Sequence, residues 1–282
     1  MSVINTNVKS LVAQNAMTVN NRSMDKAMQQ LSTGKRINNA SDDAAGMAIG
    51  NKMTAQIRGL NQAVRNANDG VSLIQTAEGA TQEITNMLQR MRELAVQAAN
   101  DTYTASDRSA LNSEVSSLSK EITRISDNTE WNGMKLFTAK SAGSDGGIGT
   151  SGKVTLQVGT GGASGNQFSV QFKDIDKALA ISGVTLATRS GATSALTTLD
   201  KAIATLDSDR ATFGATVNRL TYAMDNLASI SQNAQASRSR IMDTDYAQAT
   251  TELARSQIIQ QAATAMLAQA NQAPQSVLSL LR

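Results

Sequence analysis

The longest regular feature of this sequence is a heptad stripe of apolar residues in its first half. Apolar positions recur at spacings of three and four between residues 53 and 77, and again between residues 84 and 98. Such spacing is typical of helices that pack along a seam, as in coiled coils. We therefore expect one helix from about Ala44 to Asn100, roughly 85 Å long at about 1.5 Å per residue. The preceding Ser41-Asp42-Asp43 supplies oxygens for its N-terminal cap.

Two further stripes predict two more helices. The first runs from Leu111 to Ile125, and we expect Ser106 and Asp107 to act as its cap and first-turn acid. The second runs from Leu196 to Leu227, with Arg210 where the seam would hold an apolar group. We expect the first to fold back antiparallel on the long helix. The stem of Arg210 is expected to lie along apolar surface with its charge in water, the alternative being an ion pair with a neighbouring carboxylate.

The composition changes in the middle of the chain. Residues 141–165 contain nine of the 19 glycines and cannot sustain a helix. Beside and beyond this segment, apolar residues alternate with polar ones, which predicts two strands joined as a hairpin. The alternating residues are Val154, Leu156 and Val158, then Phe168, Val170 and Phe172. The sequence thus predicts a mainly α fold, with elongated antiparallel helical rods similar to coiled coils and a small β-hairpin lobe in the middle of the chain.

Both ends of the chain carry narrow apolar stripes in segments rich in Ala, Gln and Asn. We expect an N-terminal helix that stops at Gly34, which suits a left-handed cap, and a C-terminal helix that Pro274 breaks. One narrow face buries too little area to offset the cost of ordering a helix, roughly 1 to 2 kcal/mol per residue. These segments therefore need partners, either each other or further copies of the chain. Heterologous contacts that do not close would produce a helical filament.

The composition removes most enzyme chemistry. The 282 residues include no Cys and no His, which excludes thiol nucleophiles, imidazole bases and the usual zinc or copper sites. Asp42 and Asp43 lack the spacing of an EF-hand, and the segment Gly34-Lys35-Arg36 lacks that of a phosphate loop, so we expect no metal and no cofactor. A net charge of +3 is too small to attract nucleic acid strongly, and no nucleic-acid partner is expected.

A membrane partner is not expected either. No apolar run approaches the ~18 residues that a transmembrane helix needs. The first residues show no signal peptide, so any export would use another route. A membrane-active amphipathic protein is the alternative, but the polar faces of the end segments carry few Lys or Arg.

Several glycines interrupt the long predicted helix. Gly46 and Gly50 are spaced for the close approach of another helix. Gly59, Gly70 and Gly79 each weaken a helix by roughly 1 kcal/mol relative to Ala, which would let the rod bend.

Long motifs in this chain resemble those of bacterial flagellin, the subunit of the flagellar filament. They are Ile4-Asn-Thr-Asn-Val8, the block from Leu31-Ser-Thr-Gly-Lys-Arg-Ile37 to Ile49, Trp131-Asn132-Gly133, and the final Leu267-Ala-Gln-Ala-Asn-Gln-Ala-Pro274 with the residues up to Arg282. The resemblance covers roughly residues 1–140 and 190–282. The middle departs from it, because about fifty Gly-rich residues stand where flagellins often carry large outer domains.

The resemblance implies a division of the chain into five parts. Residues 1–43 and 243–282 would be the two segments of a coiled coil in the filament core. Residues 44–140 and 191–242 would be the halves of a helical rod domain, and residues 141–190 the short hairpin region. The residues implied in core assembly are Ile4, Val8, Leu11, Met17, Met24, Leu31, Leu253, Ile259, Met266, Leu278 and Leu281.

The resemblance also implies what the protein does. It would be a secreted, non-enzymatic subunit, exported by the flagellar type III apparatus, that assembles outside the cell into the helical filament used for motility. Implied partners are further copies of the chain, an export chaperone that holds the apolar C-terminal segment, and the filament cap and hook-associated proteins. A hook-associated junction protein, which shares flagellin-like ends, is the alternative.

A host partner is implied as well, the flagellin-sensing Toll-like receptor. The physical properties of the implied cluster are those of an ordinary solvated face, so the resemblance alone points to it. The residues implied in receptor binding are Gln89, Arg90, Leu94, Gln97 and Glu114. We expect this surface to be largely buried between subunits in a filament.

Overall fold

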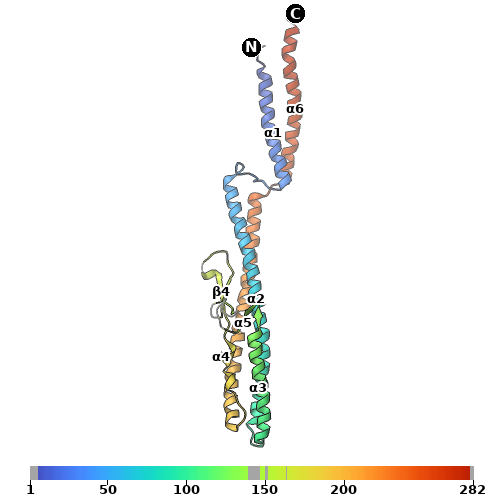
Figure 1. Ribbon diagram of the computed structural model, residues 1–282. Coiled ribbons are helices and arrows are strands. Elements are labelled where there is room, and N and C mark those ends of the chain that lie inside the picture. The colour runs from blue at the N-terminus through green and yellow to red at the C-terminus, as the bar shows by residue number, and fades with distance from the viewer. Residues whose placement is uncertain (1–5, 139–146, 150–151, 163, 280–282) are drawn as a thin grey trace. The chain divides into compact units, whose positions relative to one another are not determined.

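The computed structural model describes residues 6–138, 147–149, 152–162 and 164–279. The chain divides into two compact units: unit 1 within residues 1–57 and 232–282, and unit 2 within residues 58–231. The elements, in chain order, are α1 (Val8–Thr33), α2 (Ala44–Ala98), α3 (Ala105–Asn128), β1 (Glu130–Trp131), β2 (Met134–Lys135), β3 (Lys153–Gln157), β4 (Gln167–Gln171), α4 (Ile175–Leu179), α5 (Arg189–Met242) and α6 (Tyr246–Ser279) (Figure 1). The predicted class, mainly helical with a small β lobe in the middle, is confirmed.

Short side chains fix the ends of the predicted helices. Asp43 caps α2, because its Oδ1 accepts a hydrogen bond from the Gly46 N–H at 2.8 Å. Gly34 ends α1 with a φ of +69°, and its N–H donates to the carbonyl of Gln30. The predicted cap of α3 is wrong. Thr104, not Ser106, is the cap, and it forms a capping box with Asp107.

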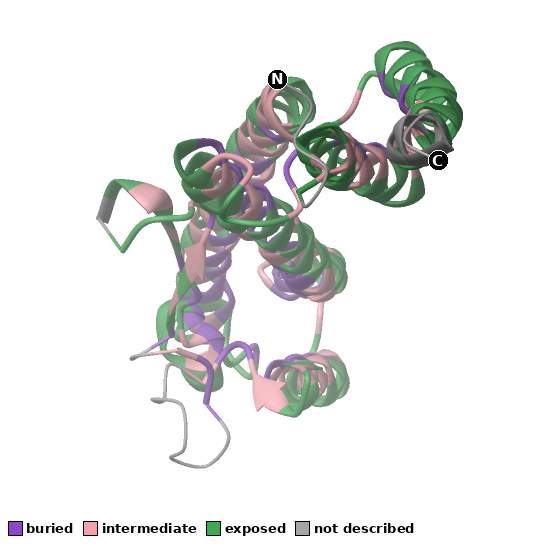
Figure 2. Cartoon of the chain, turned by 90° about the horizontal axis from the view of Figure 1, so that it is seen from above, coloured by how far each residue is buried: buried purple, intermediate pink, exposed green. Residues whose placement is uncertain are grey.

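Unit 2 contains most of the apolar core. The long helices α2 and α5 run antiparallel, since Asn61 accepts a hydrogen bond from Ser231 while Arg92 pairs with Asp200 at 2.6 Å. Their inner faces pack with α3, α4 and the β lobe around fully buried side chains such as Leu88, Phe172 and Leu199. Figure 2 shows this division, with buried positions on the inner faces of the helices and exposed positions on the outer faces.

The predicted hairpin is confirmed. Strands β3 and β4 are antiparallel, with Val154 opposite Val170 and Leu156 opposite Phe168. A second hairpin, β1–β2, turns at Asn132-Gly133, where both residues have positive φ angles (51° and 75°) that suit Asn and Gly.

Two glycines of α2 have a different use from the predicted bending. A Cβ on Gly70 would collide with a methyl group of Leu156, and a Cβ on Gly59 would lie 2.8 Å from a methyl carbon of Thr160. Between them, the Asn66 side chain donates a hydrogen bond to the carbonyl of Gln157 at 3.0 Å. These positions of α2 therefore form the surface on which the β3–β4 hairpin packs. A Cβ on Gly79 would meet nothing within 4 Å apart from its chain neighbours and the backbone of its own helix.

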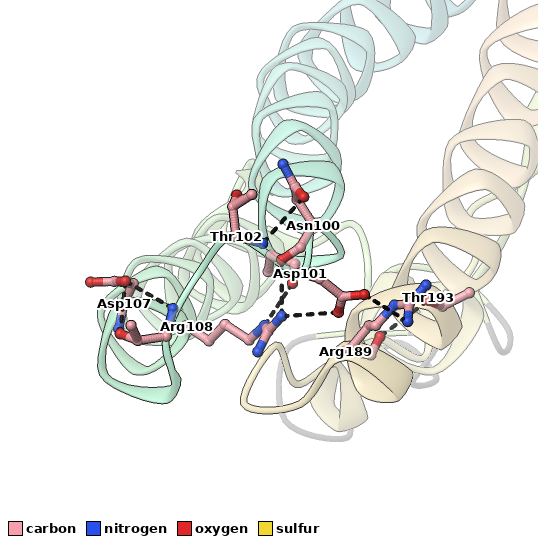
Figure 3. Close-up of polar contacts among 9 residues, drawn as sticks. Asn100, Asp101, Thr102, Asp107, Arg108, Arg189 and Thr193 are labelled. Carbon is pink, nitrogen blue, oxygen red and sulfur yellow. Dashed lines mark hydrogen bonds and ion pairs between the residues drawn. The ribbon is translucent and has the colours of Figure 1, made fainter.

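The connection between α2 and α3 is closed by Arg108 (Figure 3). Its Nε and Nη2 donate to the carbonyls of Ala98 and Asn100, both at 2.9 Å, which satisfies acceptors at the C-terminal end of α2. Asp101 then pairs with Arg189 at the start of α5, at 2.9 Å. This polar cluster holds the α2–α3 connection against α5.

Two further expectations have clear outcomes. The predicted break at Pro274 is wrong, because α6 continues to Ser279. A proline removes one helical hydrogen bond and disfavours a helix without forbidding it. Arg210 is half-buried, and the Nε of its guanidinium is buried without a hydrogen-bond partner, so this part of the charged group does not reach water as expected. The alternative is not observed either, because no carboxylate among the described residues pairs with Arg210.

Candidate interaction surfaces

Helices α1 and α6 of unit 1 pack side by side and antiparallel (Figure 1). The Asn20 side chain donates to the carbonyl of Ser256 at 2.8 Å, and that of Asn7 donates to the carbonyl of Ala270 at 2.8 Å. The residues buried in this pairing are small or polar, namely Asn20, Ala27, Ala249 and Ser256. The two ends of the chain thus partner each other, but through a contact with almost no large apolar side chain buried in it.

The base of this helix pair is held by the two linkers that enter it. The Arg36 N–H donates to the carbonyl of Met242 at 2.7 Å, and the Thr244 N–H donates to the carbonyl of Gly34 at 3.0 Å. The guanidinium of Arg36 also donates to the carbonyl of Ile241 at 2.8 Å, at the end of α5, where a positive charge is favourable. Gly50 permits close approach here as predicted, since a Cβ would lie 2.6 Å from the sulfur of Met242.

Asp42 lies in one of these linkers as a structural carboxylate. It pairs with Lys26 at 2.9 Å and accepts hydrogen bonds from the N–H groups of Asn38 and Asn39. The hydrogen bond from Lys26, followed by those from the two backbone groups, lowers the pKa of Asp42 below its ordinary value. Its oxygens are thus occupied by the linker and by α1.

A second apolar stripe runs along the outer side of α1 and α6. Val8, Val12 and Val19 of α1 are exposed, as are Ile259 and Met266 of α6, and Val12 and Met266 are 64% and 65% exposed. These residues line two grooves of about 580 and 540 Å³ on the pair, and Val12 borders both. The α1–α6 pair therefore presents two neighbouring, mainly apolar grooves, the first of which Glu252 and Arg255 also border. We call the two together the apolar groove. Nothing within the described residues of the single chain covers it. In Figure 2 the helix that ends at the C label is mostly green, which marks exposed residues.

The eleven residues predicted for core assembly divide into three groups. Val8, Leu11, Ile259 and Met266 are exposed. Met17, Met24, Leu31 and Leu253 are half-buried between the two helices or at their edge. Ile4 and Leu281, and the side chain of Leu278, lie outside the described residues.

The sequence analysis missed two members of the apolar groove, Val12 and Val19. They are seven residues apart, and Val12 follows Val8 by four, so these three form a stripe of their own on α1. A helical wheel of the N-terminal segment shows this second apolar stripe and would have identified Val12 and Val19.

The residues implied in receptor binding lie in unit 2 on α2 and α3. The guanidinium of Arg90 donates to Glu114 of α3 at 2.9 Å and pairs with Glu93 at 3.1 Å. The bond to Glu114, and then that to Glu93, raises the pKa of Arg90, which keeps it charged. The structure thus joins Arg90 and Glu114, which are distant in sequence, in one exposed ion-paired group.

The other members of this set differ in exposure. Gln89 is exposed, and Gln97 is exposed with its side chain donating to the Tyr103 hydroxyl at 3.0 Å. Leu94 is only 1% exposed and belongs to the core of unit 2. In the isolated chain it can act on a partner only by holding α2 in place.

None of the described residues forms a group of carboxylates suited to a metal ion. Among the described helices, none is both long enough and apolar enough to cross a bilayer.

Comparison with known proteins gives one consistent result. Residues 4–142 match the family model of the bacterial flagellin N-terminal helical region, and residues 196–281 match that of the C-terminal helical region. The chain is 45% identical to a flagellin of Halalkalibacterium halodurans and 42% identical to a flagellar filament 33 kDa core protein of Treponema phagedenis. Each alignment covers 99% of this chain and 100% of the relative.

Solved structures agree. A crystal structure of Bacillus cereus flagellin matches with a TM-score of 0.51 and 33% identity, over 58% of this chain and 88% of that one. A putative flagellar hook-associated protein from Vibrio parahaemolyticus matches with a TM-score of 0.58 over 72% of this chain and 100% of that one, but at 15% identity. The second likeness shows a shared fold alone.

Proposed function

Because this chain belongs to the bacterial flagellin family and is a structural subunit of the extracellular flagellar filament, we propose that its α1–α6 pair forms the filament core. The apolar groove along Val8, Val12, Val19, Ile259 and Met266 is the observation that carries this proposal. An exposed row of five large apolar side chains is unfavourable in water, and burying the exposed part of each is worth about 1 kcal/mol. Neighbouring copies in the polymer would cover it.

The alternative function, a hook-associated junction protein, has weaker support. It is supported by a fold shared with a putative hook-associated protein at 15% identity. The full-length alignments at 45% and 42% identity are with a flagellin and a flagellar filament core protein. The polymerisation test below separates the two, because a junction protein would not elongate seeds into long fibres.

The core-assembly proposal is tested by Val12→Asp in seeded elongation. A carboxylate placed in the groove must be desolvated when neighbours cover it, so we expect the critical concentration to rise at least tenfold, which corresponds to about 1.4 kcal/mol. The matched control is Gln14→Asp, another exposed position of α1 that does not line the groove. Elongation of Val12→Asp at the parent's critical concentration would contradict the proposal.

Recognition of the monomer by the flagellin-sensing Toll-like receptor is a second proposed function. It is supported by the exposed group on α2 and α3 that contains Gln89, Arg90, Gln97 and Glu114. The ion pair with Glu114 fixes the Arg90 guanidinium in one orientation, which reduces the entropy lost on binding. Leu94 would contribute by packing beneath this surface.

The receptor proposal is tested with monomeric variants in a receptor-reporter assay. We expect Arg90→Ala to raise the half-maximal concentration at least tenfold without lowering the melting temperature of unit 2, because an exposed ion pair adds little stability. Leu94→Ala should weaken activation together with stability, since truncation of a buried Leu costs about 2 to 5 kcal/mol. Arg124→Ala, which removes an exposed arginine that pairs within α3, is the control. Equal activation by Arg90→Ala and the parent would remove the site.

The remaining partners follow from assembly. We propose that an export chaperone covers the exposed apolar residues of α6 before secretion through the type III apparatus, and that filament cap and hook-associated proteins contact the ends of the polymer. Exposed apolar residues of α6 that such a chaperone would cover include Ile258, Ile259 and Met266.

A further inference from the structure

The contact between α1 and α6 follows a heptad seam. Positions that are buried or half-buried recur at spacings of three and four residues, from Ser10 to Leu31 on α1 and from Ala249 to Ala270 on α6. This spacing is that of a coiled coil of two helices. The apolar members of the seam are alanine, methionine and leucine.

A polar layer interrupts the middle of this seam and consists of Asn20, Ser256 and Gln260. Asn20 is 8% exposed and Ser256 is 1% exposed. The Asn20 amide donates a hydrogen bond to the carbonyl of Ser256 at 2.8 Å and another to the side-chain oxygen of Gln260 at 3.4 Å. The neighbouring seam positions on α1 are Met17 and Met24, so the partners of this amide come from α6.

The apolar part of the seam selects its partner weakly, because alanine is small and methionine adapts to many neighbours. A shift by one heptad would bring Ala249 or Ala263 to the place of Ser256. The same shift would move Asn20 about 10 Å along α6, away from Gln260. A buried amide that loses its hydrogen-bond partners is unfavourable. The polar layer therefore makes the observed pairing better than its alternatives.

The linkers hold only one end of the pair. Hydrogen bonds tie α1 to the start of α6 through Gly34 and Thr244. Asn20 lies fourteen residues before Gly34, which is about 21 Å along the helix, and α1 continues beyond it to Val8. Over this length the same apolar seam would also accept a helix of another copy.

We propose that the polar layer is a specificity element of unit 1. It favours pairing of α1 with α6 of the same chain, in this register, over pairing of either helix with a helix of another copy. The inference rests on the proposed filament core, in which these helices from several copies lie close together. A polar residue in a coiled-coil seam can set register and partner in this way, at a cost in stability.

The observed pairing also determines the surface that the pair presents to neighbours. Val12 and Val19 of α1 and Ile259 of α6 line one groove together. A shift of α1 by one heptad would separate these side chains along the pair by about 10 Å. Selection of the register by the polar layer therefore keeps the apolar groove in one piece.

The test uses the absence of cysteine from the chain. Ala13 lies one heptad before Asn20, and Ala263 lies one heptad after Ser256, so the two alanines are opposite each other in the antiparallel seam. In the double variant Ala13→Cys/Ala263→Cys, oxidation of the filament gives an intrachain disulfide where α1 pairs with its own α6. Pairing with another copy gives an interchain disulfide, which a non-reducing gel separates.

We expect mainly intrachain disulfide when the polar layer is intact. Addition of Asn20→Leu should raise the ratio of interchain to intrachain product at least fivefold, because leucine accepts many neighbours. Met17→Leu, at the preceding seam position, is the matched control and should keep the parent ratio. An unchanged ratio in Asn20→Leu would overturn the proposal, as would mainly interchain product with the intact layer.

Asn20→Ala covers the case in which leucine is too large for the seam. It removes the amide without adding bulk, and it should raise the same ratio at least threefold. If neither variant assembles, Asn20 serves stability rather than selection, and the proposal is wrong. The filament-core proposal fails differently, because Val12→Asp is expected to change the critical concentration and to leave the disulfide ratio at the parent value.

Discussion

Asp176 is a residue of unit 2 whose surroundings disfavour its own charge. It lies in α4, and one of its carboxylate oxygens is buried without a hydrogen-bond partner. Burial raises its pKa, and repulsion from Asp127 and Asp174 adds to this, against a hydrogen bond with Thr123 that lowers it. The folded chain therefore binds a proton here more tightly than the unfolded chain does.

We predict that Asp176→Asn stabilises the protein at neutral pH. Because the native pKa is raised, the cost of the charge is absent below the ordinary carboxylate pKa of about 4 and fully present above the native value. The melting temperature of the variant should exceed that of the parent at pH 7, and the difference should shrink as the pH falls from the raised native pKa of Asp176 towards about 4. Thermal unfolding of both proteins across this range, with the exposed Asp207→Asn as control, measures the effect. A constant difference at all pH values would contradict it.

Leu94 and Arg90 were both implied in receptor binding, but they differ in burial, because Leu94 is buried and Arg90 is exposed. Leu94 follows Met91 by three and precedes Ala98 by four, so it continues the heptad stripe, and the structure buries it with both. This could have been predicted from the sequence. The pairing of Arg90 with Glu114 could not have been predicted from the sequence, because it depends on the position of α3 along α2.

At the scale of elements, the β3–β4 hairpin packs closely on α2 because glycines of α2 have no side chains at the contact. Gly59 and Gly70 are eleven residues apart, which brings them to nearly the same face of α2, and both adjoin the hairpin. Side chains there would push the hairpin off the helix.

We predict that replacing two glycines of α2 by alanine changes the stability of the chain differently. Gly79→Ala should stabilise the chain by up to about 1 kcal/mol, since its Cβ meets nothing and alanine is the better helix former. Gly70→Ala gains the same propensity but forces Leu156 to move, so its stability should be clearly lower than that of Gly79→Ala. Denaturant unfolding of the two variants tests the order. Equal stability of the two variants would mean that close packing of the hairpin does not require a glycine at position 70.

The elements differ in how far the sequence determines them. Alternation of Val154, Leu156, Phe168 and Val170 predicted both strands and their pairing, because a period of two has one solution on a buried face. Helix ends were harder to predict, since residue type favours Ser106 slightly over Thr104 as a cap, whereas the structure uses Thr104. The short α4 was not predicted, because a five-residue helix leaves no periodic signal.

For the whole molecule, assembly follows from an incomplete core at its two ends. Unit 2 buries large apolar side chains, whereas the α1–α6 pair buries mainly small and polar ones and leaves Val12, Val19 and Met266 exposed. The narrow stripes of the sequence predicted this need for partners. Which residues face a neighbouring copy could not be predicted, because it depends on contacts between subunits rather than within one.

The most direct measurement is hydrogen exchange of the amides of α1 and α6 in dilute monomer and in assembled filament. If the two helices need neighbours to complete their core, their amides should exchange rapidly in the monomer and become strongly protected in the filament, while the core of unit 2 is protected in both. The result that contradicts this is strong protection of residues 8–33 and 246–272 in the monomer, equal to that in the filament.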